Sequence, residues 1–370
     1  MRITVIGPVY PYRGGIAHYT GQMIQALGTA GHRVHTVSFK RQYPAWLYPG
    51  ASDKDPSQCS LQVAADFVLD PLYPWTWAQA LRSIMHQQPE LVVIHWWTTF
   101  WGPAYAWLGR ALRRKGIKVV YLIHNVMPHE QRFFDPWLAR LALRQGQAFV
   151  AQTEREKGHL LGLLPGRLVR VCPLPAFSLL TGRRIPRDEA RRRLGLPAAS
   201  PVLLFFGIVR PYKGLKYLIE ALGISGEADG SPILLVAGEI WGDKEAYREQ
   251  VTRLGLSGRV RLEDRYVPDE EAAVMFSAAD LLVAPYVEGT QSAAVGMALG
   301  FGLPMVVTEV VAGGIAPENM AQVQVAAAGD APALAQAIHR GLHDPLPATQ
   351  PVIGDGAEWQ RLIQTLETLV

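Results

Sequence analysis

Two short polar segments of this 370-residue chain combine residue types that could bind a sugar attached to a diphosphate. The first reads Phe206-Gly207-Ile208-Val209-Arg210-Pro211-Tyr212-Lys213-Gly214, and the second reads Glu288-Gly289-Thr290-Gln291-Ser292. The cations Arg210 and Lys213 can neutralise a diphosphate without a metal ion. The carboxylate can hold sugar hydroxyls, and the N–H groups of a helix start attract phosphate. The two segments therefore predict a site for a nucleotide sugar.

Each of these groups also has an ordinary structural explanation. Glu288 could be a carboxylate favoured by the dipole at a helix N-terminus, and Thr290 to Ser292 could be a simple helix cap. Arg210 and Lys213 could be incidental surface cations. A positive charge at a helix N-terminus is unfavourable to the dipole, however, so a binding site for an anion explains this pair better.

The first half of the chain supplies further candidates at the ends of expected strands. Gly14-Gly15 falls between the first strand and the first helix, where glycine lets the backbone approach a ligand closely or make a tight turn. His124 and Asn125 end an apolar run. A lone histidine is often structural, but the carboxyl end of a strand is where doubly wound folds bind their ligands. We therefore count these four residues as candidates for substrate binding or catalysis.

Short apolar runs alternate with amphipathic stretches in both halves, which predicts two parallel, doubly wound α/β sheets facing across a cleft. The expected strands are Arg2–Gly7, Arg33–Phe39, Leu91–His95, Lys118–Ile123, Ala148–Ala151, Pro201–Phe206, Ile233–Ala237, Arg259–Leu262, Leu281–Ala284 and Met305–Thr308. The expected helices are Ile16–Ala30, Trp75–Gln87, Pro103–Lys115, Trp137–Gln145, Tyr212–Leu222, Lys244–Leu254, Asp269–Ser277, Ser292–Gly300, Ala331–Leu342 and Ala357–Leu369. The proline-containing stretch Cys172 to Pro186 is the candidate linker. We expect one domain over residues 1–175, a second domain over 176–355, and a C-terminal helix within residues 356–370.

With these motifs in place, the chain resembles glycosyltransferase family 4. Pro268-Asp269-Glu270-Glu271 and the run from Ala279 to Tyr286 match the family's approach to its donor-sugar loop, and Gly14-Gly15-Ile16 and His124-Asn125 fall where the family has its glycine loop and active-site histidine. The resemblance implies the GT-B fold, two Rossmann-like domains, and a retaining, metal-independent sugar transfer. It also implies that residues 1–175 form the acceptor-binding domain, that residues 176–355 form the nucleotide-sugar-binding domain, and that the helix in residues 356–370 returns to the first domain.

The resemblance also assigns roles to individual residues. Arg210 and Lys213 would stabilise the departing diphosphate, Glu288 would orient the donor sugar, and His124 would lie near the transferred sugar. The remaining substrate-binding candidates are Gly14, Gly15, Asn125, Gly207, Glu239, Gly289, Thr290, Gln291 and Ser292. The implied setting is the synthesis of cell-surface glycans or glycolipids, with a glycan or lipid-linked acceptor.

One position departs from the family pattern. The family has a second glutamate eight residues after the one that corresponds to Glu288, and this chain has Gly296 there. In the family that carboxylate usually holds the nucleotide ribose. We expect ribose to be bound differently or more weakly here, and Glu239 is one candidate to replace the missing group.

Charge and composition suggest partners and a location. Residues 1–175 hold 19 Lys and Arg against 9 Asp and Glu, a net charge of +10, whereas the rest of the chain has a net charge of −6. A basic first half suits an acidic acceptor or an anionic membrane surface, although surface charge also varies between ordinary domains. The two cysteines, Cys59 and Cys172, imply no disulfide framework. We expect a cytoplasmic protein, with peripheral contact to the inner face of the membrane as an open alternative, and no nucleic-acid partner.

Two further patterns have competing interpretations. Trp101, Tyr105, Leu108 and Leu112 share one face of an expected helix that ends in clustered cations, which suits either a membrane interface or a core-facing helix. Asp53-Lys54-Asp55 has the D-x-D form of a metal site, but it lies in the irregular region 42–57 with a lysine between its carboxylates. We expect no metal there and no cofactor apart from the nucleotide sugar itself.

Two rival functions remain open at this point. A sugar-nucleotide 2-epimerase of the same fold would bind the same donor, but the acid and base that it needs are not evident. A non-catalytic nucleotide-sugar-binding protein would explain Gly296, although Arg210, Lys213 and Glu288 are all present.

Overall fold

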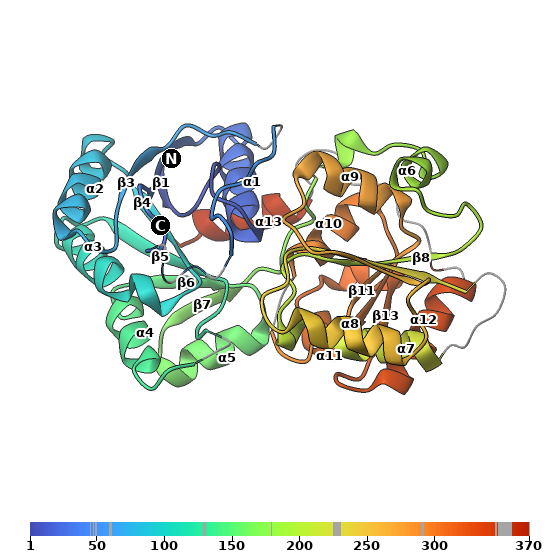
Figure 1. Ribbon diagram of the computed structural model, residues 1–370. Helices are drawn as coiled ribbons and strands as arrows, with labels where there is room; N and C mark the ends of the chain where they lie inside the picture. The colour runs from blue at the N-terminus through green and yellow to red at the C-terminus, as the bar shows by residue number, and fades with distance from the viewer. Residues whose placement is uncertain are drawn as a thin grey trace. The chain divides into compact units, whose positions relative to one another are not determined.

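A computed structural model describes residues 1–44, 46, 48, 50–58, 61–128, 131–178, 180–224, 231–289, 292–344, 346 and 357–369. The chain divides into two compact units (Figure 1). The first contains Met1–Asp55, Leu61–Pro173 and Ala357–Val370, and the second contains Pro56–Ser60 and Leu174–Gly356. Each unit is a parallel α/β sheet with helices on both faces, so the predicted fold class is confirmed.

The first unit has a seven-stranded sheet within the described residues. In spatial order its strands are β3 (Asp66–Leu69), β2 (Arg33–Phe39), β1 (Arg2–Ile6), β4 (Leu91–Trp96), β5 (Lys118–Ile123), β6 (Ala148–Ala151) and β7 (Leu168–Val171). Its helices are α1 (Gly15–Thr29), α2 (Pro74–His86), α3 (Gly102–Arg114), α4 (Asp135–Leu143), α5 (Glu154–Leu163) and α13 (Ala357–Glu367). The last helix lies beside α1, where the buried Trp359 ring packs 5.1 Å from Tyr19 (Figure 1).

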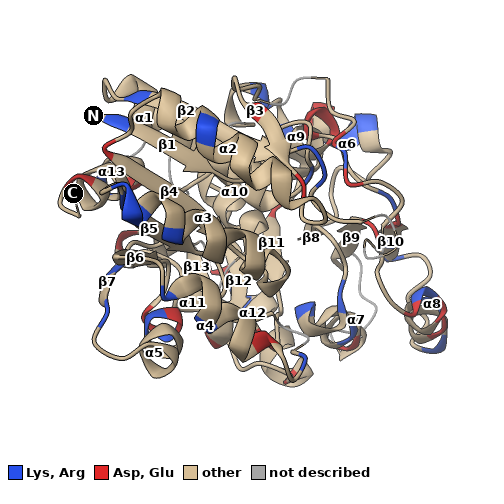
Figure 2. Ribbon diagram, turned by 90° about the vertical axis from the view of Figure 1, so that its left-hand side faces the viewer, with Lys and Arg blue, Asp and Glu red and all other residues tan. Residues whose placement is uncertain are grey.

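The second unit has a six-stranded sheet within the described residues. Its spatial order is β10 (Val260–Glu263), β9 (Ile233–Ala237), β8 (Val202–Phe206), β11 (Leu281–Ala284), β12 (Met305–Thr308) and β13 (Val323–Ala326). Its helices are α6 (Arg187–Leu194), α7 (Leu215–Ile224), α8 (Lys244–Arg253), α9 (Asp269–Ala278), α10 (Ala293–Phe301), α11 (Glu309–Ala312) and α12 (Ala331–His343). Figure 2 shows acidic and basic residues together on α6 and α8 of this unit.

Two physical causes explain most of the elements that the sequence did not predict. The strands β3, β7 and β13 lie at sheet edges, where one side faces solvent and the apolar run that marks a central strand is interrupted. The helices α5 and α6 are short and rich in charge, so their buried stripe is narrow. The prediction that one helix begins at Tyr212 was wrong, because the short helix η4 (Pro211–Lys213) and the left-handed Gly214 come before α7.

The interpretation of α3 as an interfacial helix is also wrong for its aromatic face. Trp101, Tyr105, Leu108 and Leu112 are all fully buried in the core of the first unit. Two of the three arginines of α3, Arg113 and Arg114, lie in its last turn, where the helix dipole favours cations. Of the helices in the described ranges, none combines the length and the apolar character needed to span a bilayer. Membrane contact through the first unit stays a prediction.

Candidate functional site

The loops at the carboxyl end of the second sheet bring the main sequence candidates together. Strand β8 lies between β9 and β11, so the chain leaves β8 toward one side and later returns on the other. Such a reversal of strand order opens a crevice at the strand ends, and open α/β sheets bind ligands there. The loop after β8 carries Arg210 and Lys213, the loop after β11 carries Glu288, and the loop after β9 carries Glu239. Thr290 and Gln291 lie outside the described residues.

The loops after β8 and β9 are held together by a close backbone approach. Gly207 and Gly238 have φ angles of 97° and 150°, and a Cβ atom on Gly238 would lie 2.2 Å from the Gly207 carbonyl oxygen. Past this contact, the Val209 N–H donates to the Glu239 carbonyl at 2.9 Å, and the Trp241 N–H donates to the Val209 carbonyl at 2.9 Å. Gly238 therefore has to be glycine, because any side chain there would push apart the loops that carry Arg210 and Glu239, whereas at Gly207 it is the φ angle that favours glycine.

A second backbone junction links the loops after β8 and β11. Gly214 has a φ angle of 71°, and a Cβ atom there would lie 2.0 Å from the Pro285 carbonyl oxygen. The Tyr212 carbonyl accepts the Val287 N–H at 2.8 Å and lies 3.4 Å from the Glu288 nitrogen. The exposed Glu288 and the half-buried Lys213 are therefore positioned by the same junction.

The charged group of Lys213 is partly shielded from solvent. Its Nζ lies 5.4 Å from the centre of the Tyr286 ring, and no carboxylate pairs with it in the part of the chain that the structure describes. Burial lowers the pKa of Lys213, Tyr212 opposes this change, and the nearby Arg210 adds to it. The Arg210 guanidinium lies 5.4 Å from the centre of the Trp241 ring. An anion bound near both side chains would favour the charged form of Lys213 and would offset the repulsion between the two cations.

Tyr286 organises this region, although sequence reasoning missed it. Its hydroxyl is 2.9 Å from the Ser292 Oγ, and its carbonyl accepts the Thr308 hydroxyl at 2.6 Å. Burial raises the pKa of Tyr286 to about 12, so the phenol stays neutral. Because Ser292 bonds to Tyr286, its side chain does not cap α10. The first-turn N–H groups of α10 are thus left uncapped by the side chain that precedes them.

The position of the expected second glutamate is packed against another segment of the same unit. Gly296 lies in α10, its carbonyl accepts the Phe177 N–H at 2.9 Å, and a Cβ atom there would lie 3.4 Å from the Phe177 ring. One turn later, a Cβ atom on Gly300 would lie 2.1 Å from the Phe177 carbonyl oxygen. The two glycines let the backbone around Phe177 pack directly on α10. A role for the half-buried Glu239 in holding ribose stays a prediction.

In the first unit, the same kind of reversal occurs between β1 and β4. Gly14 precedes α1 with a φ angle of 106°, which only glycine adopts readily, and a Cβ atom there would meet no atom within 4 Å. A side chain at position 14 would therefore meet no steric obstacle, so the φ angle alone favours glycine there. Gly15 begins α1, whose preceding residue offers no side-chain cap.

His124 is paired with a second histidine that sequence reasoning missed. The His95 Nδ1 and His124 Nε2 atoms are 2.9 Å apart, and the two rings stack with their centres 5.2 Å apart. The edge of Tyr19 packs against both rings. Burial lowers the pKa of His95 well below its usual value and that of His124 to about 3. His95 lies inside the apolar run of β4, so nothing in the sequence separated it from the core, while the half-buried Asn125 follows His124 as predicted.

This histidine pair should make the protein sensitive to acid. Because both pKa values are lower in the folded state, the unfolded chain binds more protons below about pH 6.5. We expect the free energy of unfolding to fall as the pH drops below this value, with a slope of about 1.4 kcal/mol per pH unit for each histidine. Urea unfolding of wild type and His124→Asn at pH 7, 6 and 5 tests this.

The His124→Asn variant should lose less stability between pH 7 and pH 5 than wild type, since it lacks one of the two protonation events. Substitution of the exposed His86 by Asn should leave the wild-type profile unchanged. Parallel profiles for wild type and His124→Asn would contradict the neutral, buried pair.

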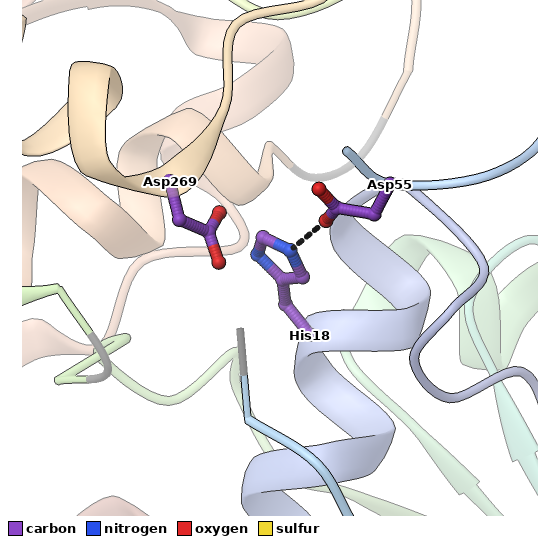
Figure 3. A group of neighbouring side chains, drawn as sticks. All are labelled: His18, Asp55 and Asp269. Atoms are coloured by element: carbon purple, nitrogen blue, oxygen red, sulfur yellow. Dashed lines mark hydrogen bonds and ion pairs between the residues drawn. The ribbon is translucent and has the colours of Figure 1, made fainter. Parts of the chain in front are cut away.

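The three charged side chains of the Asp53-Lys54-Asp55 segment make contacts with different partners. The buried Asp55 Oδ2 is 3.4 Å from the His18 Nε2 (Figure 3). The Lys54 Nζ lies over the Tyr12 ring, 3.3 Å from its centre, and 3.9 Å from the Asp53 Oδ1. The two carboxylates of the D-x-D segment are therefore held by different neighbours.

Comparison with known proteins places both halves in one class. Residues 14–176 match the family model described as "Glycosyl transferase 4-like domain", and residues 200–344 match "Glycosyl transferases group 1". The chain is 32% identical over 208 residues to D-inositol 3-phosphate glycosyltransferase 1 of Catenulispora acidiphila. The matched stretch covers 49% of this chain and 49% of the relative. The match thus spans about half the length of this curated relative.

Solved structures show the same fold. The chain superposes over its full length on the whole of Anabaena Alr3699/HepE, solved in complex with UDP and glucose, with a TM-score of 0.71 and 18% identity. It also resembles a putative UDP-N-acetylglucosamine 2-epimerase from Listeria monocytogenes, with a TM-score of 0.62 and 14% identity, over 99% of this chain and 96% of the other.

Proposed function

This chain is a glycosyltransferase of the family 4 type with the GT-B fold, and we propose that it transfers a sugar from a nucleoside diphosphate to an acceptor hydroxyl with retention of configuration. The observation that carries the proposal is the junction of the loops after β8 and β11. It holds the partly desolvated Lys213 beside the loop of Glu288, at the strand reversal where α/β sheets bind ligands. The relative solved with UDP and glucose supports a nucleotide-sugar donor.

In this proposal the second unit binds the donor. Arg210 and Lys213 contact the diphosphate and stabilise the charge that develops as the bond from the anomeric carbon to phosphate breaks. Glu288 accepts hydrogen bonds from the sugar hydroxyls. The uncapped first turn of α10 adds N–H donors for phosphate.

The acceptor oxygen forms its bond to the anomeric carbon on the face that the phosphate leaves, and the departing phosphate takes the hydroxyl proton. We assign no side chain as a nucleophile. His124 is neutral at physiological pH because of its low pKa, so in this proposal it acts as an uncharged hydrogen-bonding group and not as a cation. This proposal places the enzyme in the synthesis of cell-surface glycans or glycolipids.

Turnover should not depend on a divalent metal ion, since the two cations neutralise the diphosphate. We expect the protein to keep roughly 80–100% of its untreated rate after treatment with EDTA, measured as release of nucleoside diphosphate. Loss of the rate on chelation, with recovery on addition of Mn²⁺ or Mg²⁺, would contradict the metal-independent mechanism.

Two rival functions predict different consumption of the donor. A transferase releases nucleoside diphosphate when an acceptor is present, a 2-epimerase changes the sugar nucleotide with no acceptor at all, and a binding protein does neither. The likeness to the Listeria protein keeps the epimerase in view, although at 14% identity it concerns the fold alone.

The test is a panel of UDP-, GDP- and ADP-sugars incubated with and without a mixture of sugar, sugar phosphate and lipid-linked acceptors. Nucleoside diphosphate and the remaining sugar nucleotide are both quantified. Release of nucleoside diphosphate that rises with acceptor supports the proposal. An altered sugar nucleotide without acceptor would support the epimerase instead.

A further inference from the structure

The first unit contains a pocket of about 490 Å³ that the donor site does not use. It lies where the chain leaves β1 and β2, and its walls include three tyrosines and three cations: Tyr12, Tyr43, Tyr48, Lys40, Arg41 and Lys54. This volume is in the range of small-molecule sites. The pocket also adjoins the glycine loop, because the Arg13 N–H, next to Gly14, donates to the Asp53 carbonyl at 3.1 Å.

The lining of the pocket has an excess of positive charge. Asp53 is the one carboxylate among its described lining residues. Arg41 is paired at 3.1 Å with the buried Asp70, which lies outside the lining. Lys40 is exposed and has no carboxylate partner in the described part of the chain. Lys40 is thus a cation whose charge remains available to a ligand.

Lys54 is a second cation of the pocket, and unlike Lys40 it has a carboxylate nearby. It packs over the Tyr12 ring and is 3.9 Å from the Asp53 carboxylate, a long ion pair on a half-exposed side chain. Burial lowers the pKa of Lys54 despite Asp53. A bound anion would favour its charged form.

The tyrosine rings of the pocket are held in place by hydrogen bonds. The Tyr43 hydroxyl accepts the Trp97 Nε1–H at 2.7 Å, and the Tyr48 hydroxyl accepts the Arg13 Nε–H at 2.7 Å. The two rings stack with their centres 6.2 Å apart and an angle of 28°. Fixed aromatic faces offer a flat apolar surface beside polar groups, so little ordering is needed when a ligand binds.

We propose that this pocket binds the acceptor, and that the acceptor is an anionic carbohydrate, a sugar ring that carries a phosphate or a carboxylate. The cations Lys40 and Lys54 bind the anionic group, and the tyrosine faces contact the ring. This inference rests on the proposed function, because the pocket needs the separate donor site in the second unit.

Binding is tested by calorimetric titration with glucose 6-phosphate, glucuronate, glucose and inorganic phosphate on wild type and Lys40→Ala. We expect the two anionic sugars to bind at least about 10-fold more tightly than glucose or phosphate alone, and Lys40→Ala to weaken them by about 10-fold, as for loss of one charge-assisted contact. The phosphate and carboxylate arms show which anion is preferred. Lys115→Ala, which removes an exposed lysine of the same unit outside the pocket, is the matched control and should bind as wild type does.

Three results would overturn the proposal. Glucose could bind as tightly as the anionic sugars, inorganic phosphate could bind as tightly as glucose 6-phosphate, or Lys40→Ala could leave all affinities unchanged. Titration with nucleoside diphosphates on the same proteins separates the two inferences. If Lys40→Ala abolishes nucleotide binding, the pocket serves the donor. If anionic sugars bind through Lys40 but no nucleotide binds wild type, the donor proposal fails while the pocket stands.

Discussion

Replacing Lys213 with alanine should lower turnover by about 10²–10³-fold while the protein remains folded, and Arg210→Ala should have an effect of the same size. Each variant removes a cation that stabilises charge on the departing diphosphate. The loss should appear in the maximal rate as well as at low donor concentration, since this charge is greatest in the transition state. The measurement is steady-state release of nucleoside diphosphate.

Lys216→Ala is the matched control for this pair. Lys216 lies in the first turn of α7, three residues after Lys213, but it is exposed and packs over Tyr217. We expect its rate to stay within about 2-fold of wild type, as is usual for a surface substitution. Rates near wild type in both Arg210→Ala and Lys213→Ala would contradict the assignment of the diphosphate site.

The second large effect concerns Gly214. An alanine there would have to adopt a φ angle near 71° with its Cβ 2.0 Å from the Pro285 carbonyl oxygen. The left-handed conformation costs about 1–2 kcal/mol and the overpacking about 1–3 kcal/mol, so we expect a loss of about 2–5 kcal/mol in the free energy of unfolding. Urea unfolding measures this loss. The loop of Glu288 should also be displaced, which should weaken donor binding.

Gly195→Ala separates the two contributions. Gly195 ends α6 with a φ angle of 64°, but a Cβ atom there would meet nothing within 4 Å. This control should lose only the conformational part, about 1–2 kcal/mol, and should bind donor as wild type does. Equal losses in the two variants would show that the contact between Gly214 and Pro285 does not hold the loops together.

The central strands and most helices could be predicted because burial on both faces leaves a continuous apolar run in the sequence. The edge strands β3, β7 and β13 could not, since polar residues interrupt their runs. The aromatic face at the start of α3 shows a different limit of prediction from sequence. Spacing placed Trp101 and Tyr105 on one face, but the spacing alone did not decide whether the face meets core or membrane.

The candidate site, like the fold, could be predicted from the sequence only in part. Charged residues at strand ends, such as Lys213 and Glu288, stand out in the sequence, and the strand order of the second sheet brings their loops together. His95 was missed because it lies within an apolar strand, and Tyr286 was missed because it carries no charge and comes just after such a strand. The contacts of Gly214 with Pro285 and of Gly238 with Gly207 join residues that are distant in the sequence and lie in loops after different strands. Without a map of spatial neighbours, the sequence did not show that these glycines hold the loops together.

The central claim is that Arg210 and Lys213 hold the diphosphate of the donor, and nucleotide binding tests it most directly. We would titrate UDP, GDP and ADP into wild type, Lys216→Ala and the double variant Arg210→Ala/Lys213→Ala by calorimetry. At about 1.5–3 kcal/mol for each charge-assisted contact, the double variant should bind the preferred nucleotide at least 100-fold (roughly) more weakly than wild type, and Lys216→Ala should bind it equally well. Equal affinity in wild type and the double variant would contradict the account.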